Sequence, residues 1–394
     1  MSSHRLFIVL LGLLVGLSPL AIDMYLPSMP AIADDLQASP GTVQMTVSIY
    51  LLFFAIPQLF FGPLSDAFGR RRTIFCGLAL YVGGALLCTL APSIETLLAA
   101  RALQATGSAA ISVTVPALVK DRFSGPDYTS TMGFIMMVMA IAPMIAPMIG
   151  GLIFTVGGWR GIFFTLVLIA ILSGTLFKIA IPETLAANRR KPLNMRGLVA
   201  NYKLLLGDRH CLGLALCTSL VFAGLMTFIT ASPFVYIELY GVSPQLYGVL
   251  FGLNVIGTLS LTYTSNRLVY RLGNAKLLRA SVCLVVFASI CLAVISFIPK
   301  PPLPVIIVCC ALFIANMGIL TSNVMAIVMS RFAHISGATS AVIGTLRFGI
   351  AALAGTVVSL LHSTSSTPLT AVMALCGFLL LLAYLLAGRN PDAT

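Results

Sequence analysis

The sequence predicts an all-α polytopic membrane protein with about twelve transmembrane helices in two pseudo-symmetric six-helix bundles. Three observations predict this fold. Of the 394 residues, 59% are hydrophobic and only 9% are charged, whereas an ordinary soluble protein is roughly 25% charged. Apolar windows of about 20 residues, long enough to cross ~30 Å of hydrocarbon, fit about twelve times. One long basic connection divides the chain near its middle.

The apolar windows are long and do not alternate with polar residues, so they exclude a membrane β-barrel and favour helices. The predicted spans are 6–28, 42–64, 73–92, 96–118, 130–155, 160–181, 211–237, 244–265, 277–298, 303–329, 338–362 and 367–387.

The two predicted bundles cover residues 1–181 and 211–394, joined by a basic cytoplasmic linker over 182–210. A parallel repeat of membrane units produces this layout. Weak internal similarity supports it: "LSDAFGRRR" from Leu64 aligns with "TSNRLVYRLG" from Thr264, and "KDRF" from Lys120 aligns with "MSRF" from Met329. Each pair occupies equivalent positions in the two halves, which indicates duplication.

The basic residues predict the orientation. With a cytoplasmic N-terminus, the inner segments hold 19 of the 23 basic residues, whereas Arg160 and Lys300 lie outside. The 19 are Arg5, Arg70, Arg71, Arg72, Lys120, Arg122, Lys178, Arg189, Arg190, Lys191, Arg196, Lys203, Arg209, Arg267, Arg271, Lys276, Arg279, Arg331 and Arg389. Both termini are therefore expected to be cytoplasmic. The net charge of +12 then reflects a positive-inside bias toward an anionic leaflet, and no nucleic-acid partner is expected.

Cysteine and histidine give no functional signal. The nine cysteines occur singly or as one adjacent pair without CxxC spacing, and the four histidines lie at helix ends or in loops. Small buried hydrophobic thiols explain this distribution. We expect no metal site and no cofactor.

Charged residues within the spans are few: Asp23 in the first, Arg101 in the fourth and Arg347 in the eleventh. Asp23 and Arg101 each lie five residues from the predicted outer end of their span, about 8 Å deep. A charge at mid-membrane costs roughly 2.5–3.5 kcal/mol, so such groups usually face protein or a water-filled cavity. One interpretation is an ion pair that ties helices one and four together. The other is a titratable Asp23 in a translocation cavity with Arg101 nearby.

Two further stretches suggest moving parts. In "GPLSDAFGRRR" (62–72), Gly62 and Gly69 permit a turn and close helix approach, and Asp66 can pair with Arg70 or Arg71. We interpret this stretch as an interhelical latch, with a simple topology anchor as the alternative. In "APMIAPMIGG" (142–151), Pro143 and Pro147 each remove a helix hydrogen bond, and Gly150 and Gly151 allow tight contact. This segment predicts either an ordinary kink or a bend beside a cavity.

Further polar side chains lie within or near the spans, and each suits an interhelical contact as well as a ligand contact. They are Tyr25, Gln44, Asn254, Asn316 and Asn323.

Together these stretches resemble the major facilitator superfamily. "GPLSDAFGRRR" is similar to its loop motif, although Ala67 stands where an arginine is frequent. "LAARALQATGSAA" is similar to its fourth-helix motif through Arg101, Gln104 and Gly107, with Ala105 in place of a usual glycine. "APMIAPMIGG" is similar to the fifth-helix motif of antiporters.

A narrower resemblance covers nearly the whole chain. "SPLAIDMYLPSMP", "QMTVSIYLLFFAIPQLFFGPLSD", "GGWRGIFF", "IPETL" and "RFGIAALAG" are similar to the bicyclomycin and chloramphenicol resistance (Bcr/CflA) drug:proton antiporters. The resemblance implies that Asp23 binds a proton or substrate with Arg101 as its partner. It also implies that Asp66 and Arg70 form a cytoplasmic gate.

We therefore expect a multidrug exporter of the bacterial inner membrane that exchanges inward protons for an outward antibiotic or metabolite. It should work as a monomer by rocking two bundles about a central site. A proton symporter or uniporter for a nutrient has the same architecture and is the alternative. An intramembrane enzyme is less favoured, because the sequence shows no Ser/His or paired-carboxylate constellation within the spans and no GxxxxGK[ST] motif.

Overall fold

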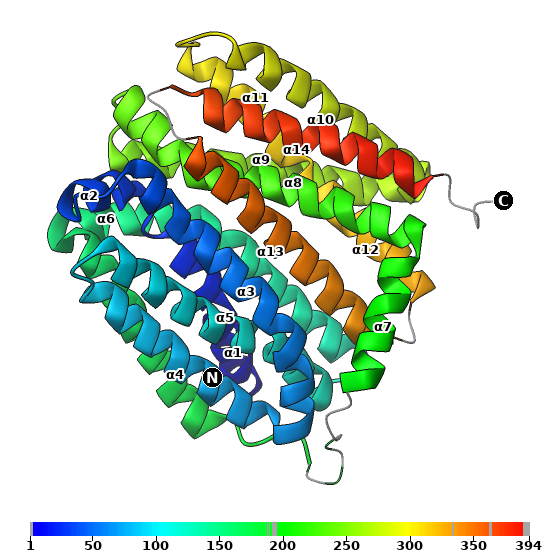
Figure 1. Cartoon of the computed structure of the whole chain (residues 1–394). Coiled ribbons are helices and arrows are strands. Elements are labelled where there is room, and N and C mark those ends of the chain that lie inside the picture. The colour runs from blue at the N-terminus through cyan, green and yellow to red at the C-terminus, as the bar shows by residue number, and fades with distance from the viewer. Residues whose placement is uncertain are drawn as a thin grey trace. The chain divides into compact units, whose positions relative to one another are not determined.

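The computed structural model describes residues 3–186, 188, 190, 195–332, 335–361 and 365–388. Every regular element in these residues is a helix, which confirms the predicted all-α fold (Figure 1). Contacts divide the chain into two compact units. Unit 1 comprises Met1–Asn194 together with Pro244–Val249, and unit 2 comprises Met195–Ser243 together with Leu250–Thr394.

Unit 1 is built from helices in which α5 contacts both α3 and α4, and α6 contacts both α1 and α4. Its elements are α1 (Ser3–Asp23), the 3-10 helix η1 (Leu26–Ser28), α2 (Met29–Asp35), α3 (Pro40–Phe68), α4 (Arg70–Thr89), α5 (Ile94–Arg122) and α6 (Gly125–Ala180). Ser39 caps α3 and Ser93 caps α5, each accepting from a backbone amide three residues later.

The first span is longer than the sequence predicted. The predicted end at residue 28 is wrong, because the apolar helical segment runs over Phe7–Asp35. Pro27 and Pro30 lie in the first turns of η1 and α2, where a missing amide N–H removes no helix hydrogen bond. The prolines therefore divide the span without ending it.

Helix α6 contains two predicted spans. Its 56 residues would extend about 84 Å if straight, far more than one bilayer. Gly158, with φ 63° and ψ −171°, breaks the helical dihedrals between the predicted spans 130–155 and 160–181. Eleven helical segments of the described residues are long and apolar enough to cross a membrane. Dividing Ser130–Ala180 at Gly158 brings them to the predicted twelve.

In unit 2, α8 contacts α13 and α14, and α10 contacts α11, α12 and α14. The remaining helices are α7 (Met195–Gly207), α8 (Arg209–Pro233), the π-helix η3 (Phe234–Leu239), α9 (Pro244–Leu272), α10 (Asn274–Ser296), α11 (Leu303–Ala315), α12 (Met317–Arg331), α13 (Ser336–Leu360) and α14 (Thr367–Ala387). All belong to unit 2 except the first residues of α9, Pro244–Val249, which belong to unit 1. Asn316 separates α11 from α12, which together form the predicted span 303–329.

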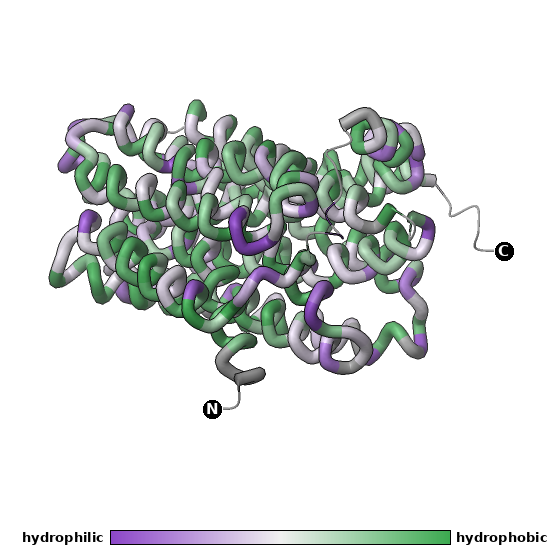
Figure 2. The backbone as a smooth tube through the Cα atoms, turned by 90° about the horizontal axis from the view of Figure 1, so that it is seen from below, coloured by the Kyte–Doolittle hydropathy of each residue, from purple (hydrophilic) through white to green (hydrophobic). Residues whose placement is uncertain are grey.

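The surface of the helices is apolar. Figure 2 shows hydrophobic colour along most of the backbone tube, with hydrophilic segments as short interruptions. Large side chains such as Val156 and Leu386 are 92% and 72% exposed. Apolar surface on this scale is unfavourable in water and is covered by acyl chains in a bilayer. The protein is therefore a multi-pass membrane protein.

Candidate functional site

Asp23 ends α1 and lies inside unit 1. Its side chain is only 3% exposed, and Oδ1 has no hydrogen-bond partner among the residues that the structure describes. The helix stops here, and the chain turns through Tyr25 into η1. A polar carboxyl group is thus held at a break within a membrane span, where its unused hydrogen-bonding capacity favours binding of a proton or ligand.

Arg101 projects from α5 into an enclosure of aromatic rings. It is 0% exposed, and its Nη1 donates to Ala21 O at 3.0 Å and to Gln104 Oε1 at 2.7 Å. The guanidinium carbon Cζ lies 4.6 Å from the Tyr25 ring centre, 4.3 Å from that of Tyr50 and 5.7 Å from that of Phe163. Stacked rings and carbonyl oxygens replace part of the water that this cation loses on burial.

The structure does not support the ion-pair interpretation of Asp23 and Arg101. Within the described part of the chain, no ion pair of 4.0 Å or less joins them. Arg101 instead contacts α1 through Ala21, two residues before Asp23. The shared membrane depth of Asp23 and Arg101 stays a prediction, and the apolar segment that holds Asp23 continues to Asp35.

Tyrosine hydroxyls hold the helices around this site. The Tyr25 hydroxyl is 2.8 Å from Thr46 Oγ1, and the Tyr50 hydroxyl is 2.6 Å from Ser108 Oγ. Thr46 Oγ1 already donates to Val43 O at 2.6 Å, so Tyr25 is the donor to Thr46. Tyr25 and Gln104 thus both contact Arg101.

Gln44 lies on α3, two residues before Thr46, and is 2% exposed. The sequence analysis did not single out Tyr50, Ser108 or Phe163. The signal available for Tyr50 was its helical spacing with Val43, Val47 and Phe54, all of which are buried on α3.

The predicted antiporter segment reaches the same site through Gly150. A Cβ atom at residue 150 would lie 1.7 Å from Met24 O, so α6 and the residue after Asp23 are in backbone contact. At Gly151 the corresponding atom would lie 3.4 Å from Pro244 O, within unit 1. Helix α6 keeps helical dihedrals through Pro143 and Pro147, because its non-helical residue is Gly158.

The predicted latch is a network centred on Arg70. Its Nη1 is 2.5 Å from Asp66 Oδ1 and 2.6 Å from Ser65 Oγ, and its Nε is 2.9 Å from Asp121 Oδ2. Gly69 has a φ of 104°, which favours glycine and turns the chain sharply from α3 into α4. A Cβ at Gly62 would meet Val113 at 3.6 Å, an ordinary contact.

Glu183, which the sequence analysis did not assign to the latch, completes the network. Its Oε1 accepts from the backbone amide of Arg70 at 3.0 Å, and its Oε2 accepts from that of Arg71 at 3.2 Å. A carboxylate at the first amides of α4 satisfies orphan donors and complements the helix dipole. The Arg71 side chain donates to Lys178 O at 2.8 Å. Glu183 follows the end of α6, so this carboxylate joins α4 to the end of that helix.

The predicted asparagines of unit 2 differ in role. Each donates from Nδ2 to a carbonyl four residues earlier on its own segment: Asn254 to Leu250, Asn316 to Leu312 and Asn323 to Ile319. Asn316 Oδ1 also accepts from Ser281 Oγ of α10 at 3.0 Å, which makes it an interhelical contact. Asn254 Oδ1 is buried and has no partner among the described residues.

Arg347 of α13 also belongs to unit 2. Its Cζ lies 4.1 Å from the Phe222 ring centre, and its Nη2 contacts Met317 Sδ at 3.9 Å. Its Nε is buried without a partner among the described residues.

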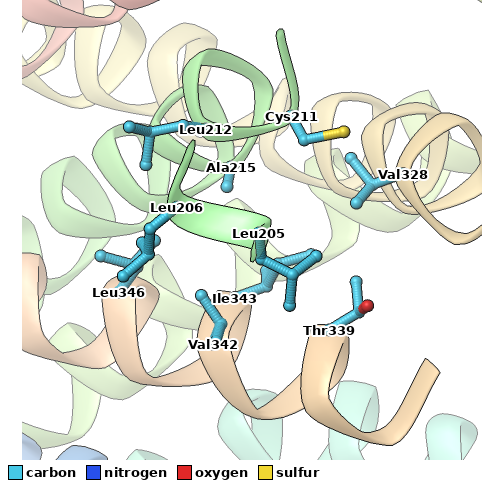
Figure 3. A pocket seen from close by; sticks show the side chains of 10 residues that line it. All are labelled: Leu205, Leu206, Cys211, Leu212, Ala215, Val328, Thr339, Val342, Ile343 and Leu346. Carbon is cyan, nitrogen blue, oxygen red and sulfur yellow. The ribbon is translucent and has the colours of Figure 1, made fainter. Parts of the chain in front are cut away.

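A small apolar pocket lies between α7, α8, α12 and α13 of unit 2 (Figure 3). Leu, Ile, Val and Ala side chains line it, with Cys211 and Thr339 as its more polar members. It lacks charged lining residues and therefore suits neither a proton site nor an anion. Among the described residues, no group of three His, Cys, Asp or Glu side chains is placed to hold a metal ion.

Residues 11–356 match the sequence profile of the Major Facilitator Superfamily. The bicyclomycin resistance protein homolog of Haemophilus influenzae is 33% identical over 98% of this chain and 98% of its own length. Multidrug resistance protein D of Escherichia coli is 27% identical over 96% and 94%. The inward-facing, unoccupied structure of a bacterial homolog of the human lysosomal transporter Spinster superposes with a TM-score of 0.72 at 14% identity, covering 98% of this chain and 96% of that one.

The profile match spans most of the chain, and the bicyclomycin resistance homolog aligns along almost its whole length. The fold agrees with that of a solved transporter. The chain therefore belongs to the major facilitator superfamily, as a transporter of the Bcr/CflA drug-resistance type.

Proposed function

We propose that this protein is a proton-coupled multidrug efflux antiporter that exports small antibiotics or related metabolites by alternating access. Membership of the superfamily makes the chain a transporter and not an enzyme. The relatives named for bicyclomycin and multidrug resistance support drugs as the exported compounds. The proton is the proposed coupling ion, and no metal or other cofactor takes part.

The observation that carries the proposal is the Asp23 carboxyl, which is buried at a helix break without a cationic partner among the described residues. Binding of a proton neutralises this group, and release of the proton restores its charge. Because α6 contacts Met24 directly, a change at Asp23 can reach the twin-proline helix through Gly150. Arg101 is held by Ala21, Gln104 and the surrounding rings, so it remains a fixed positive charge on the other side of the α1 turn.

In the proposed cycle, Asp23 takes a proton when the site is open to the periplasm and the drug leaves. Inward opening releases the proton and admits a new drug molecule. One inward proton gains roughly 2.3 kcal/mol per 100 mV of membrane potential. That free energy supports roughly a forty- to fiftyfold gradient of a neutral drug if one proton moves per cycle.

The test is the variant Asp23→Asn, which keeps the size and shape of the side chain and is uncharged like the protonated acid, but cannot lose a proton. In inverted membrane vesicles, addition of chloramphenicol should release protons from vesicles with the wild-type protein. Vesicles with Asp23→Asn should show no drug-dependent release at the same expression level. Asp23→Glu should retain part of the signal.

Asp34→Asn is the matched control, because Asp34 is an exposed acid of α2. It should behave as the wild type. Wild-type proton-coupled efflux by a well-expressed Asp23→Asn variant would show that this carboxyl is not the coupling site.

A proton symporter or uniporter for a nutrient is the second candidate function, because the same architecture serves both directions of transport. The direction of substrate movement in inverted vesicles, with and without a proton gradient, separates these functions. Accumulation inside inverted vesicles that collapses with the gradient supports antiport. Efflux from the vesicles together with protons would assign symport.

We also propose that the transporter is a monomer in a bacterial inner membrane with both termini cytoplasmic. The concentration of basic residues in the segments on the same side as the termini supports this orientation. Lipid and small molecules, and not nucleic acid, are the partners that the charge distribution favours.

A further inference from the structure

Arg347 is a cation in the interior of unit 2 without an anionic partner in that unit. The sequence holds no Asp or Glu between Glu238 and Asp392. Asp208 of unit 2 pairs with Arg331, with Oδ2 3.0 Å from Nη2. Glu238 lies in η3, at the far end of α8 from Asp208, and no ion pair joins it to Arg347 among the described residues. The spans of α9 to α14 therefore supply no carboxylate for Arg347.

Lipid headgroups are also out of reach for this side chain. Arg347 lies near the middle of the span Gly337–Leu360, about 15 Å or more from either end. Arginine side chains reach the membrane surface by snorkelling only from positions near a helix end. An anionic partner of Arg347 is therefore neither a lipid phosphate nor a carboxylate of unit 2.

Arg101 and Arg347 differ in the number of their contacts. Arg101 donates to two oxygen atoms through Nη1 and has three aromatic rings around it, although its Nε and Nη2 have no partner among the described residues. Arg347 has one ring, that of Phe222, and one weak acceptor, Met317 Sδ. Its Nε is buried without a partner among the described residues. A guanidinium has five N–H donors in a planar fork, so most of its hydrogen-bonding capacity remains free.

The surroundings of Arg347 suit an amphipathic ligand. The Phe222 ring lies beside the guanidinium and forms an edge-on pair with Phe348, at 5.0 Å between ring centres. Met317 adds a flexible apolar side chain that adapts to ligands of different shape. The neighbouring polar group, the Asn316 amide, is already bonded to Leu312 and Ser281.

We propose that Arg347 binds the anionic group of transported compounds, so that the substrates of this protein include aromatic carboxylates. This inference rests on the proposed export function. The planar guanidinium would accept a carboxylate in bidentate fashion, while Phe222 and Met317 contact the apolar body of the compound.

The test measures binding to the purified full-length protein in detergent, without a proton gradient. The probes are nalidixate, salicylate and cinnamate, each paired with its uncharged methyl ester, and binding is followed by thermal stabilisation and titration calorimetry. At least one carboxylate should bind the wild type about tenfold more tightly than its ester. Arg347→Gln should remove that preference, whereas Arg347→Lys should keep part of it.

Arg279→Gln is the matched control for loss of one positive charge, because Arg279 is an exposed residue of α10 in the same unit. It should leave the preference unchanged. The melting temperature of each unliganded variant reports whether it folds, and Arg347→Lys carries the test if Arg347→Gln does not fold.

Two results would overturn the proposal: no carboxylate preferred over its ester by the wild type, or an unaltered preference in Arg347→Gln. Failure of the proposed export function is measured separately, as absence of proton-coupled chloramphenicol transport in vesicles. Carboxylate binding through Arg347 without such transport would retain the anion site and reject drug antiport.

Discussion

Gly150 of α6 and Met24, the residue that follows α1, are in direct backbone contact: a Cβ atom at residue 150 would lie 1.7 Å from the Met24 carbonyl oxygen. This contact joins the twin-proline segment to the residue after Asp23. It explains a glycine in a helix interior, where glycine costs stability relative to alanine. Any movement of this part of α6 must therefore change the surroundings of Asp23 or break the contact.

We expect Gly150→Ala to destabilise the protein, because a methyl group cannot fit against a backbone carbonyl without a shift of α1 or α6. Such overpacking costs about 1–3 kcal/mol. The melting temperature in detergent should fall by several degrees, and drug efflux should fall with it. Gly133→Ala, in the same helix with nothing within 4 Å of its added Cβ, is the control. That variant should melt at the wild-type temperature or higher, and equal melting of both variants would contradict the contact.

The rings around Arg101 predict that lysine cannot replace it. A lysine ammonium is a point charge on a flexible stem and cannot stack on Tyr25 and Tyr50 while donating to both Ala21 and Gln104. The Arg101→Lys variant should therefore lose most of its chloramphenicol efflux. The measurement is the chloramphenicol susceptibility of an efflux-deficient host that expresses the variant. Arg279→Lys, at an exposed position, should remain fully active. Full activity of Arg101→Lys would mean that charge alone suffices.

The spans were predictable because composition decides them. Twenty apolar residues in succession fit a bilayer whatever their neighbours, so even the division of α6 followed from the sequence around Gly158. The end of the first span was not predictable in the same way. The predicted span ended at residue 28, whereas Pro27 and Pro30 lie in the first turns of η1 and α2, which continue the segment. The effect of a proline on a helix depends on its position, because a proline in the first helical turn removes no hydrogen bond.

Only those residues of the candidate site whose type is unusual in a membrane span could be predicted from the sequence. Asp23 and Arg101 are charges in apolar spans, and the sequence therefore singled them out. Tyr50 and Phe163 are common apolar-span residues, and their role depends on packing between helices distant in sequence. Glu183 likewise lies 113 residues from the Arg70 amide that it accepts from. One sequence without coordinates holds no signal for contacts of that separation.

Glu183 gives a prediction for the latch. Glu183→Gln removes the negative charge beside the first amides of α4, and such a charge at a helix N-terminus contributes about 0.3–1 kcal/mol. The melting temperature should fall by roughly 2–4 °C for each 1 kcal/mol lost. Asp34→Asn is the control, because Asp34 is an exposed carboxylate at the end of α2, away from the first amides of a helix. A fall of equal size in Asp34→Asn would assign the effect to lost charge in general and not to the latch.

Variants of Asn316 and Asn254 distinguish an asparagine that joins two helices from one whose side-chain oxygen has no partner among the described residues. Asn316→Ala leaves the Ser281 hydroxyl of α10 only its longer, 3.5 Å contact with the carbonyl of residue 316, and loss of a hydrogen bond costs about 0.5–1.5 kcal/mol. This variant should melt several degrees lower while exporting the same compounds.

Asn254→Ala removes an oxygen without a partner among the described residues and a bond within its own helix. The melting temperature of Asn254→Ala should stay close to that of the wild type. If the Asn254 oxygen contacts a substrate, host cells with this variant should show a changed pattern of resistance across different drugs. Scanning calorimetry measures the melting temperature of both variants, and a drug panel measures the resistance that each confers. An Asn316→Ala variant with the wild-type melting temperature would show that the Ser281 contact does not hold α10 to the α11–α12 junction.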